Sequence, residues 1–195
     1  MTRSFDPRPV DPQLLDHLVE LASRAPSAGK TQGWHLVVLS GDQTGRFWDI
    51  TLPVERRSTF RWQHLLTAPI IALPLADPLA YTARYSEPDK IASGLGAGPQ
   101  AWPTPYWTVD ASMSLMTLLL AAEDNGLGAL FFGVFHNEDQ LRSLLGIPEH
   151  LQLLGAVALG WPFAEDRAEQ GLSANRPRRR PAEIVHHGCW SGGHS

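Results

Sequence analysis

Residues 24–40 read RAPSAGKTQGWHLVVLS and connect a helical pattern to an apolar segment. Residues 26–32 of this stretch bring together proline, serine, alanine, glycine, lysine, threonine and glutamine, whereas a plain connector needs only one or two turn residues. Backbone N–H groups between the helix end and the strand start would lie there beside short hydroxyl, amide and ammonium donors. A loop of this kind suits an anionic or polar planar ligand.

The elements on both sides of this loop have clear patterns. Residues 11–24 begin with an aspartate at the N-cap and a proline in the first turn, and their leucines recur on one helical face. Residues 34–40, WHLVVLS, are short, apolar and partly β-branched, which is typical of a buried strand. Weaker patterns predict helices over residues 42–50 and 55–66.

Three further apolar segments are expected to complete a sheet. They are residues 69–76 (PIIALPLA), 129–135 (ALFFGVF) and 151–160 (LQLLGAVALG). Pro74 indicates an edge or a strand end, because proline donates no ladder hydrogen bond. Helices that alternate with these apolar strands predict a layered α/β or α+β sandwich with helices over the sheet, but they do not fix the strand order.

A long apolar helix is expected from Asp110, as its N-cap, to Gly126, as its stop. It is apolar on nearly every face, so it is either buried all round or part of a subunit interface. A capped helix follows over residues 137–146. Residues 77–109 are rich in proline, glycine and aromatics, as lids and binding segments often are. We therefore expect one domain, residues 1–195, with a lid-like insertion at about 77–109.

The composition excludes several classes of function. A net charge of -4 gives no electrostatic footprint for nucleic acid. The single cysteine, Cys189, excludes an internal disulfide framework and fits a reducing cytoplasm. No secretory apolar run opens the chain, and the longest apolar stretch, residues 115–122, is too short to cross a membrane. We expect a cytoplasmic protein with neither nucleic acid nor membrane as a partner.

Other motifs carry less weight. The glycines of residues 93–100 follow no strand, and Pro99 stands where a dinucleotide-binding helix would begin. Residues 186–194 contain three histidines and Cys189, but a strand end and a frayed tail explain them better, so no metal site is expected. No nucleophile elbow, zinc-protease or P-loop pattern occurs. Acyl transfer, zinc hydrolysis and kinase chemistry all lose support.

Arginines gather near the end of the chain, in the stretch RPRRRP at residues 176–181. Arg178, Arg179 and Arg180 offer bidentate contacts to a phosphate. A solvated basic run would explain the same pattern, so the stretch alone does not decide between the two.

Five segments, taken in order, resemble the nitroreductase family of FMN-dependent oxidoreductases. They are RSFDPRPVD (3–11), RAPSAGKTQGWHLVV (24–38), PYWTVDASMSLMTLLLAAEDNGLGALFFGVF (105–135), ALGWP (158–162) and RRRPAEIVHHGCW (178–190). The resemblance implies an α+β sandwich with a central mixed sheet covered by helices. It also implies an intertwined homodimer in which the long helix crosses the twofold axis, C-terminal segments embrace the partner and two FMN molecules lie at the interface.

The resemblance also assigns residues to the cofactor. Arg3 would lie near the pyrimidine edge or the ribityl chain of the flavin. Phe132 and Gly133 match the turn whose backbone N–H approaches the reactive flavin nitrogen, and glycine permits that approach. The phosphate and ring contacts would come from the loop residues Ser27, Ala28, Gly29, Lys30 and Gln32. A basic pair formed by Arg179 with Arg178 or Arg180 would also hold the phosphate.

The chain departs from the family pattern at three points. Lys30 stands where asparagine is usual, and its ammonium could stabilise negative charge on reduced flavin. Gly33 stands where proline is usual. The arginine and serine that usually precede Arg3 are missing, so either the C-terminal arginines carry the phosphate or the true start lies upstream.

The function implied by the resemblance is hydride transfer from NADH or NADPH, through FMN, to a nitroaromatic, a quinone or a similar planar oxidant, with ping-pong kinetics. No catalytic acid, base or nucleophile is assigned, because the flavin does the chemistry. Four aromatic residues are expected either to form substrate walls or a lid or to pack beneath a long loop: Tyr85, Trp102, Tyr106 and Trp107.

Three other functions stay open at this point. A dehalogenase, an azoline oxidase or a flavin-fragmenting enzyme would use the same fold and cofactor on another substrate. A flavin storage or sensory module would bind FMN without meaningful turnover. A metal-dependent interaction protein built on the histidine-rich tail is the weakest alternative.

Overall fold

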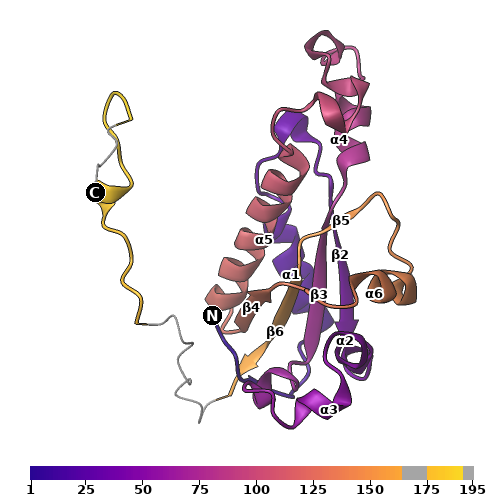
Figure 1. Cartoon of the computed structure of the whole chain (residues 1–195), viewed down its shortest axis with the longest axis vertical. Coiled ribbons are helices and arrows are strands. Elements are labelled where there is room, and N and C mark those ends of the chain that lie inside the picture. Colours follow the sequence, from indigo (N-terminus) through magenta and orange to yellow (C-terminus); the bar gives the residue numbers. More distant parts are fainter. Residues whose placement is uncertain (164–174, 191–195) are drawn as a thin grey trace.

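A sheet of six strands lies between two layers of helices in the computed structural model, which describes residues 1–163 and 175–190 (Figure 1). The strands are β1 (Phe5–Asp6), β2 (Trp34–Ser40), β3 (Ile70–Ala76), β4 (Gly128–Phe132), β5 (Gln152–Leu153) and β6 (Ala156–Pro162). Their order is β1-β6-β3-β2, with β4 also paired to β6 and β5 to β3. The expected α+β class is confirmed.

Every strand pair of the described sheet is antiparallel, so the expected mixed sheet is wrong for this single chain. The connection between β2 and β3 explains why these two strands are antiparallel. It leaves the sheet at Ser40 and returns at Ile70, and these two residues are register partners. A parallel pair would require the connection to cross to the other end of the sheet.

Pro74 lies inside the sheet and not at an edge, which corrects the sequence-based expectation. On one side of β3, residues 70–72 pair with β6 and residues 75–76 pair with β5. The Pro74 carbonyl accepts a hydrogen bond from Leu154 N (3.0 Å) on that same side. The nitrogen of Pro74 therefore faces the break between β5 and β6, where the ladder requires no donor.

Helices cover both faces of the sheet. They are α1 (Pro12–Ala22), α2 (Gln43–Thr51), α3 (Val54–Arg57), α4 (Pro78–Tyr85), α5 (Tyr106–Asp124) and α6 (Glu138–Leu145). Because side chains alternate along a strand, β3 sends Ile71 and Leu73 into the core under α2 and α6, and Ile70 and Ala72 into the core under α1 and α5. The predicted helices at 11–24, 42–50 and 137–146 are confirmed.

Two helix predictions were wrong in their extent. The segment 55–66 forms only the end of α3 and the 3-10 turn η2 (Gln63–Leu65), because the Gln63 side-chain amide bonds the carbonyls of Arg57 and Phe60 and closes the first turn. The long helix α5 begins at Tyr106, so Asp110 is not its N-cap but a buried residue within it.

The segment 77–109 folds into helical turns beyond one end of the sheet (Figure 1). Asp77 caps α4 by accepting from Leu79 N and Ala80 N, and three 3-10 turns follow: η3 (Ile91–Ser93), η4 (Leu95–Ala97) and η5 (Pro99–Ala101). Neither the division into one domain nor the lid role of this segment is tested by the fold, so both stay predictions.

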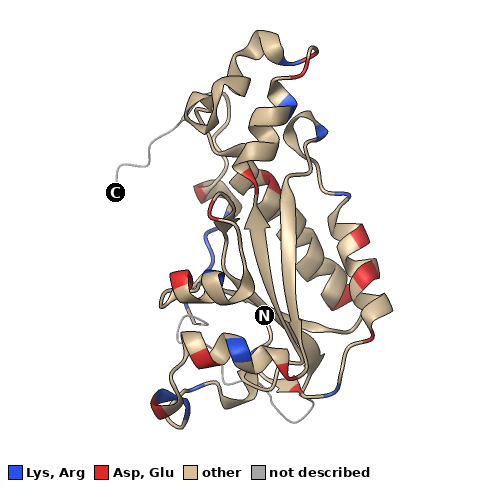
Figure 2. Ribbon diagram, turned by 90° about the vertical axis from the view of Figure 1, so that its right-hand side faces the viewer, with Lys and Arg blue, Asp and Glu red and all other residues tan. Residues whose placement is uncertain are grey.

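Apart from Asp6 in the edge strand β1, the charged residues lie outside the described sheet. Strands β2, β3, β4 and β6 contain no Lys, Arg, Asp or Glu, and Figure 2 shows the charged residues on the surrounding helices and loops. Polar chemistry is therefore confined to the strand ends and to the segments that join them.

Candidate functional site

Residues 27–32 form a tight loop around the 3-10 turn η1 (Ala28–Lys30). Gly29, Lys30 and Gln32 have φ angles of 62°, 55° and 53°, in the left-handed region. Glycine adopts this conformation freely, but each non-glycine residue held there costs about 1 to 3 kcal/mol. The loop therefore needs contacts that hold it in place.

One external contact comes from the buried carboxylate of Asp110. Its Oδ2 accepts hydrogen bonds from Ala28 N and from the Tyr81 hydroxyl, both at 2.7 Å, and the residue is only 4% exposed. Burial, and then the hydrogen bond to Asp110, raise the pKa of Tyr81 well above its ordinary value. Tyr81 thus stays protonated and donates to the carboxylate.

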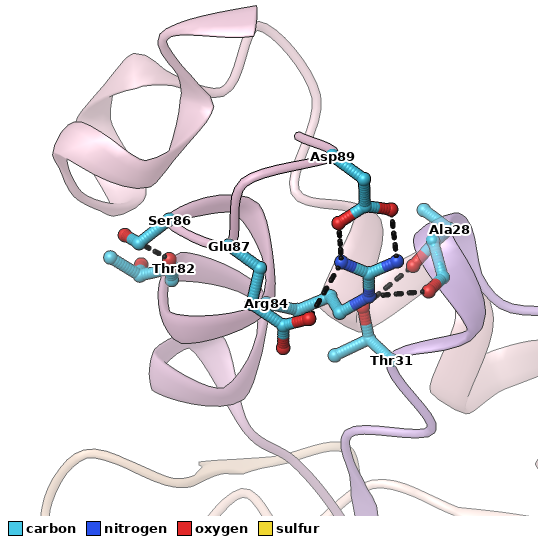
Figure 3. Close-up of polar contacts among 8 residues, drawn as sticks. Ala28, Thr31, Thr82, Arg84, Ser86, Glu87 and Asp89 are labelled. Carbon is cyan, nitrogen blue, oxygen red and sulfur yellow. Dashed lines mark hydrogen bonds and ion pairs between the residues drawn. The ribbon is translucent and has the colours of Figure 1, made fainter. Parts of the chain in front are cut away.

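The other external contact comes from Arg84, in the last turn of α4 (Figure 3). Its Nε donates to the Gly29 carbonyl (2.9 Å), while Nη1 and Nη2 donate to both carboxylate oxygens of Asp89 (2.7 and 2.8 Å). Nη1 also bonds Glu87 (3.0 Å). The hydrogen bond from Arg84 lowers the pKa of Asp89 to about 2. The guanidinium is thereby fixed in one orientation.

Replacing Asp89 with asparagine gives a pH-dependent loss of stability. The folded pKa of about 2 lies below the ordinary 3.8, so the stabilisation is complete above the ordinary value and is lost as pH falls through the folded value. We expect the difference in urea midpoint between wild type and Asp89→Asn to be the same at about pH 5 and about pH 7, and to shrink between about pH 4 and pH 2.

The double variant Arg84→Lys/Asp89→Asn is the control for this prediction. Lysine cannot form the bidentate bond, so Asp89→Asn added to Arg84→Lys should cost less stability than it costs in the wild type. A difference in midpoint that stays constant down to about pH 2 would contradict the bridge.

A cavity of about 390 Å³ opens on the α2 and α6 side of the sheet. Its walls include Arg3, Phe132 and Gly133, three of the residues expected to contact the cofactor, and many of the other lining residues are aromatic. The Trp48 ring stacks on Phe132 at 6.0 Å, and the Arg3 guanidinium lies 5.1 Å from the centre of the Trp62 ring. Small-molecule sites are commonly lined in this way, by apolar rings with a few polar groups.

Two atomic details suit this cavity to a planar ligand. A Cβ at Gly133 would collide with the ring of Phe135, so glycine lets a flat ring lie directly against the backbone there. Trp48 Nε1 is buried without a hydrogen-bond partner among the described residues, and such a donor costs free energy until it is paired.

The structure does not bring all the expected residues together in one chain. Arg3, Phe132 and Gly133 share the cavity, but none of the loop residues 27–32 lines it. The loop contacts α4 and the first turns of α5 instead. The two groups of expected cofactor residues therefore lie in two separate places in the single chain.

The C-terminal arginines lie away from both places. Figure 1 shows residues 175–190 apart from the folded body, and Arg178, Arg179 and Arg180 are all exposed. Their hydrogen bonds are local, since Arg179 donates to the Glu183 carbonyl and the Arg180 backbone N donates to the Glu183 carboxylate (2.6 Å). Within a single chain these arginines do not reach the loop.

The expected substrate aromatics pack mainly on one another. Trp102 is buried, donates from Nε1 to the Leu95 carbonyl (3.0 Å) and meets Tyr85 edge to face at 4.6 Å. Its ring centre lies 5.9 Å from that of Tyr106 and 6.2 Å from that of Trp107. This geometry favours packing for Trp102, and contact with substrate stays a prediction for all four residues.

Sequence reasoning missed Tyr81, Arg84 and the actual role of Asp110. A signal for Asp110 was present, because a carboxylate within an otherwise apolar helix must find donors when it is buried. Arg84 gave no such signal, since an arginine in the last turn of a short helix is commonplace.

The sequence predicted neither a metal site nor a membrane-spanning segment. Over residues 1–163 and 175–190, no group of three His, Cys, Asp or Glu side chains could hold a metal ion, and His194 lies outside the described residues. None of the described helices combines the length and the apolar character that a membrane crossing requires.

Comparison with known proteins gives three kinds of similarity. The family model described as "Nitroreductase family" matches residues 1–161. An NADH dehydrogenase of Thermus thermophilus is 30% identical over 188 residues, which cover 89% of this chain and 85% of the relative. A Bacillus subtilis protein named "FMN reductase [NAD(P)H]" is 29% identical over 190 residues, which cover 95% of this chain and 68% of the relative.

A solved structure described as an oxidoreductase containing FMN superimposes with a TM-score of 0.72 at 18% identity. The match covers 98% of this chain and 88% of the other. At this level of identity the match shows a shared fold.

Proposed function

Because this chain belongs to the nitroreductase family, we propose that it passes hydride from NADH or NADPH, through FMN, to a planar oxidant such as a nitroaromatic or a quinone. The enzyme class is an NAD(P)H-dependent flavin oxidoreductase, and its cofactor is FMN. When bound, the flavin accepts hydride from the nicotinamide and delivers it to the oxidant. The protein contributes binding, orientation and electrostatics.

The observation that carries the proposal is the joint placement of Arg3 and Gly133 in one aromatic cavity. Phenylalanine and tryptophan rings there suit a flat heterocycle, and Gly133, which has no side chain, would offer its backbone N–H at short range once the exposed Phe135 ring moves aside. Arg3 adds a cation for the polar edge or chain of the ligand. In this arrangement Lys30, from the loop, would stabilise negative charge on the ring.

The separation of the two parts of the site supports a homodimer. We propose that the loop of one subunit meets the cavity of the other, so that two FMN molecules lie between the subunits. The outer face of α5 suits such an interface, since Val109, Met116 and Leu120 are exposed along one side of the helix. Monomeric proteins seldom leave such an apolar stripe uncovered.

The C-terminal segment supports the same assembly. Ile184, Val185 and Trp190 are exposed on a segment that lies apart from its own body, so they lack a covering surface in the single chain (Figure 1). We propose that residues 175–190 pack on the partner and carry Arg178, Arg179 and Arg180 to the phosphate. A cytoplasmic location stays a prediction.

A spectroscopic experiment tests the proposed function directly. We expect the purified protein to be yellow, with the visible absorbance of FMN, and to be bleached by NADH or NADPH in the absence of air. A nitroaromatic or a quinone should then restore the colour.

Two outcomes would contradict the proposal. A protein that takes up no added FMN would remove it altogether. A yellow protein that neither nicotinamide bleaches would leave only flavin binding without turnover.

A further inference from the structure

The bonds within the loop do not determine its shape by themselves. Lys30 N donates to the Ser27 carbonyl (2.9 Å) and Gln32 N to the Ser27 hydroxyl (3.0 Å), while Thr31 N and Oγ1 both donate to the Ala28 carbonyl (3.2 and 2.6 Å), so every one of these bonds stays within the loop. Lys30 and Gln32 nevertheless keep their costly left-handed conformations. A strained segment persists only when its surroundings impose it.

Arg84 and its neighbour on α4 hold the turn at Gly29. The guanidinium donates to the Gly29 carbonyl, and Asp89 fixes its other nitrogens (Figure 3). A Cβ placed on Gly29 would lie 3.0 Å from the Tyr85 ring, so the ring abuts the turn from the same helix. Hydrogen bonds from a charged donor are stronger than those between neutral groups.

Asp110 holds the preceding residue of the loop. The carboxylate accepts from Ala28 N and is buried, so it depends on this N–H and on the Tyr81 hydroxyl for its stability. Tyr81 belongs to α4 and Asp110 to α5, so the carboxylate ties the loop to both helices.

Gly33, which directly follows the loop, is held from the same segment. Asp77 N donates to the Gly33 carbonyl (3.0 Å). A Cβ on Gly33 would come within 2.7 Å of the Tyr81 ring, so the backbone at Gly33 lies directly on that side chain. Residues 77–110 thus contact the loop at Ala28 and Gly29 and also hold the residue that follows it.

We propose that Arg84 and Asp110 are positioning residues that hold residues 27–32 in the geometry that binds FMN, so that the segment 77–110 sets the affinity for the cofactor. This inference rests on the proposed function. It assigns to the insertion a role in cofactor binding in addition to the substrate contact expected from the sequence. Any ligand that moves α4 would change the affinity for FMN, and FMN would change the affinity for that ligand by the same factor.

The test compares Arg84→Lys, Asp110→Asn and Tyr81→Phe with wild type in the full-length protein freed of flavin. We expect Arg84→Lys and Asp110→Asn each to raise the FMN Kd by about tenfold, because each weakens a hydrogen bond that involves a charged group. Tyr81→Phe leaves the bond from Ala28 N in place, so its effect should be smaller, about threefold.

Hydrogen exchange separates positioning from a general loss of stability. In the flavin-free variants, amides of residues 28–32 should exchange faster while those of β3 stay protected. Arg142→Lys is the matched control, because Arg142 also bonds backbone carbonyls, at Pro148 and Leu151, far along the chain from the loop. It should lower the melting temperature and leave the FMN Kd unchanged.

Several outcomes would overturn the proposal. One is an FMN Kd within about twofold of wild type in both Arg84→Lys and Asp110→Asn. Another is a rise of the same size in Arg142→Lys, since affinity would then simply follow stability. If Asp110→Asn fails to fold, the FMN Kd values of Arg84→Lys and Tyr81→Phe still test the proposal. If the wild type takes up no FMN, the proposed function fails, and exchange at residues 28–32 alone shows whether the two residues hold the loop.

Discussion

Replacing Leu120 with aspartate is expected to give a monomeric, colourless protein. Leu120 is 55% exposed on α5, on the same side as Met116, which is 51% exposed. In a twofold dimer the substitution places two carboxylates in one apolar contact, and an unpaired buried charge costs several kcal/mol. We expect the dissociation constant of the dimer to rise by at least about 100-fold, which corresponds to about 2.7 kcal/mol.

Loss of the dimer should remove FMN as well. The loop and the cavity lie apart within one chain, so under the proposed assembly a monomer would lack the flavin contacts that the partner supplies. Sedimentation measures the assembly, and visible absorbance after dialysis measures the bound flavin. Both should change together in the Leu120→Asp variant.

Leu144→Asp is the matched control, because Leu144 is 42% exposed on α6 and undergoes the same chemical change. It should stay dimeric and yellow. A dimeric Leu120→Asp protein would exclude the α5 interface. A monomeric one that binds FMN as tightly as wild type would exclude a site shared between subunits.

The four main strands and most helices could be predicted because their signals are local. The two-residue strand β1 was not predicted, and the single strand expected at residues 151–160 is divided into β5 and β6. The apolar runs at residues 34–40 and 69–76 specify β2 and β3 almost to the residue, whereas the run at 129–135 locates β4 but extends beyond its end at Phe132. The alternation along β3 then fixes which residues enter each core. These features depend on neighbours within a few residues.

The errors arose where a distant partner overrides a local rule. Asp110 has the sequence signature of an N-cap, yet its carboxylate bonds Ala28, 82 positions away, and the helix extends back to Tyr106. Pro74 has the signature of an edge, yet a break between two other strands accommodates it. Propensity is a weak prior, and tertiary contacts routinely override it.

The division of the site could not be predicted for a related reason. Arg3, Gly133 and the loop all carry family motifs, but their relative placement depends on the strand order and on which face each connection covers. The pairing of Arg84 with Gly29 spans 55 positions and follows from the way α4 packs. Motifs therefore identified the components of the site but not their distribution over the fold.

Replacing Gly133 with alanine is expected to keep the fold and to weaken FMN binding by about 30-fold, which corresponds to about 2 kcal/mol. The new Cβ would meet only the ring of Phe135, which is 86% exposed and can rotate away. Gly133 has no positive φ, so alanine fits its backbone. The free energy of unfolding of the flavin-free protein should therefore change by less than about 1 kcal/mol.

The loss of affinity follows from the cavity that Gly133 lines. A methyl group there holds a planar ligand away from the backbone N–H, and no rotation of Phe135 relieves that contact. Gly45→Ala is the control, because a Cβ at this α2 position meets nothing within 4 Å. It should stabilise the helix by about 0.5 to 1 kcal/mol and leave the FMN Kd unchanged. An unchanged Kd in Gly133→Ala, with flavin bound to the wild type, would place the ring away from this turn.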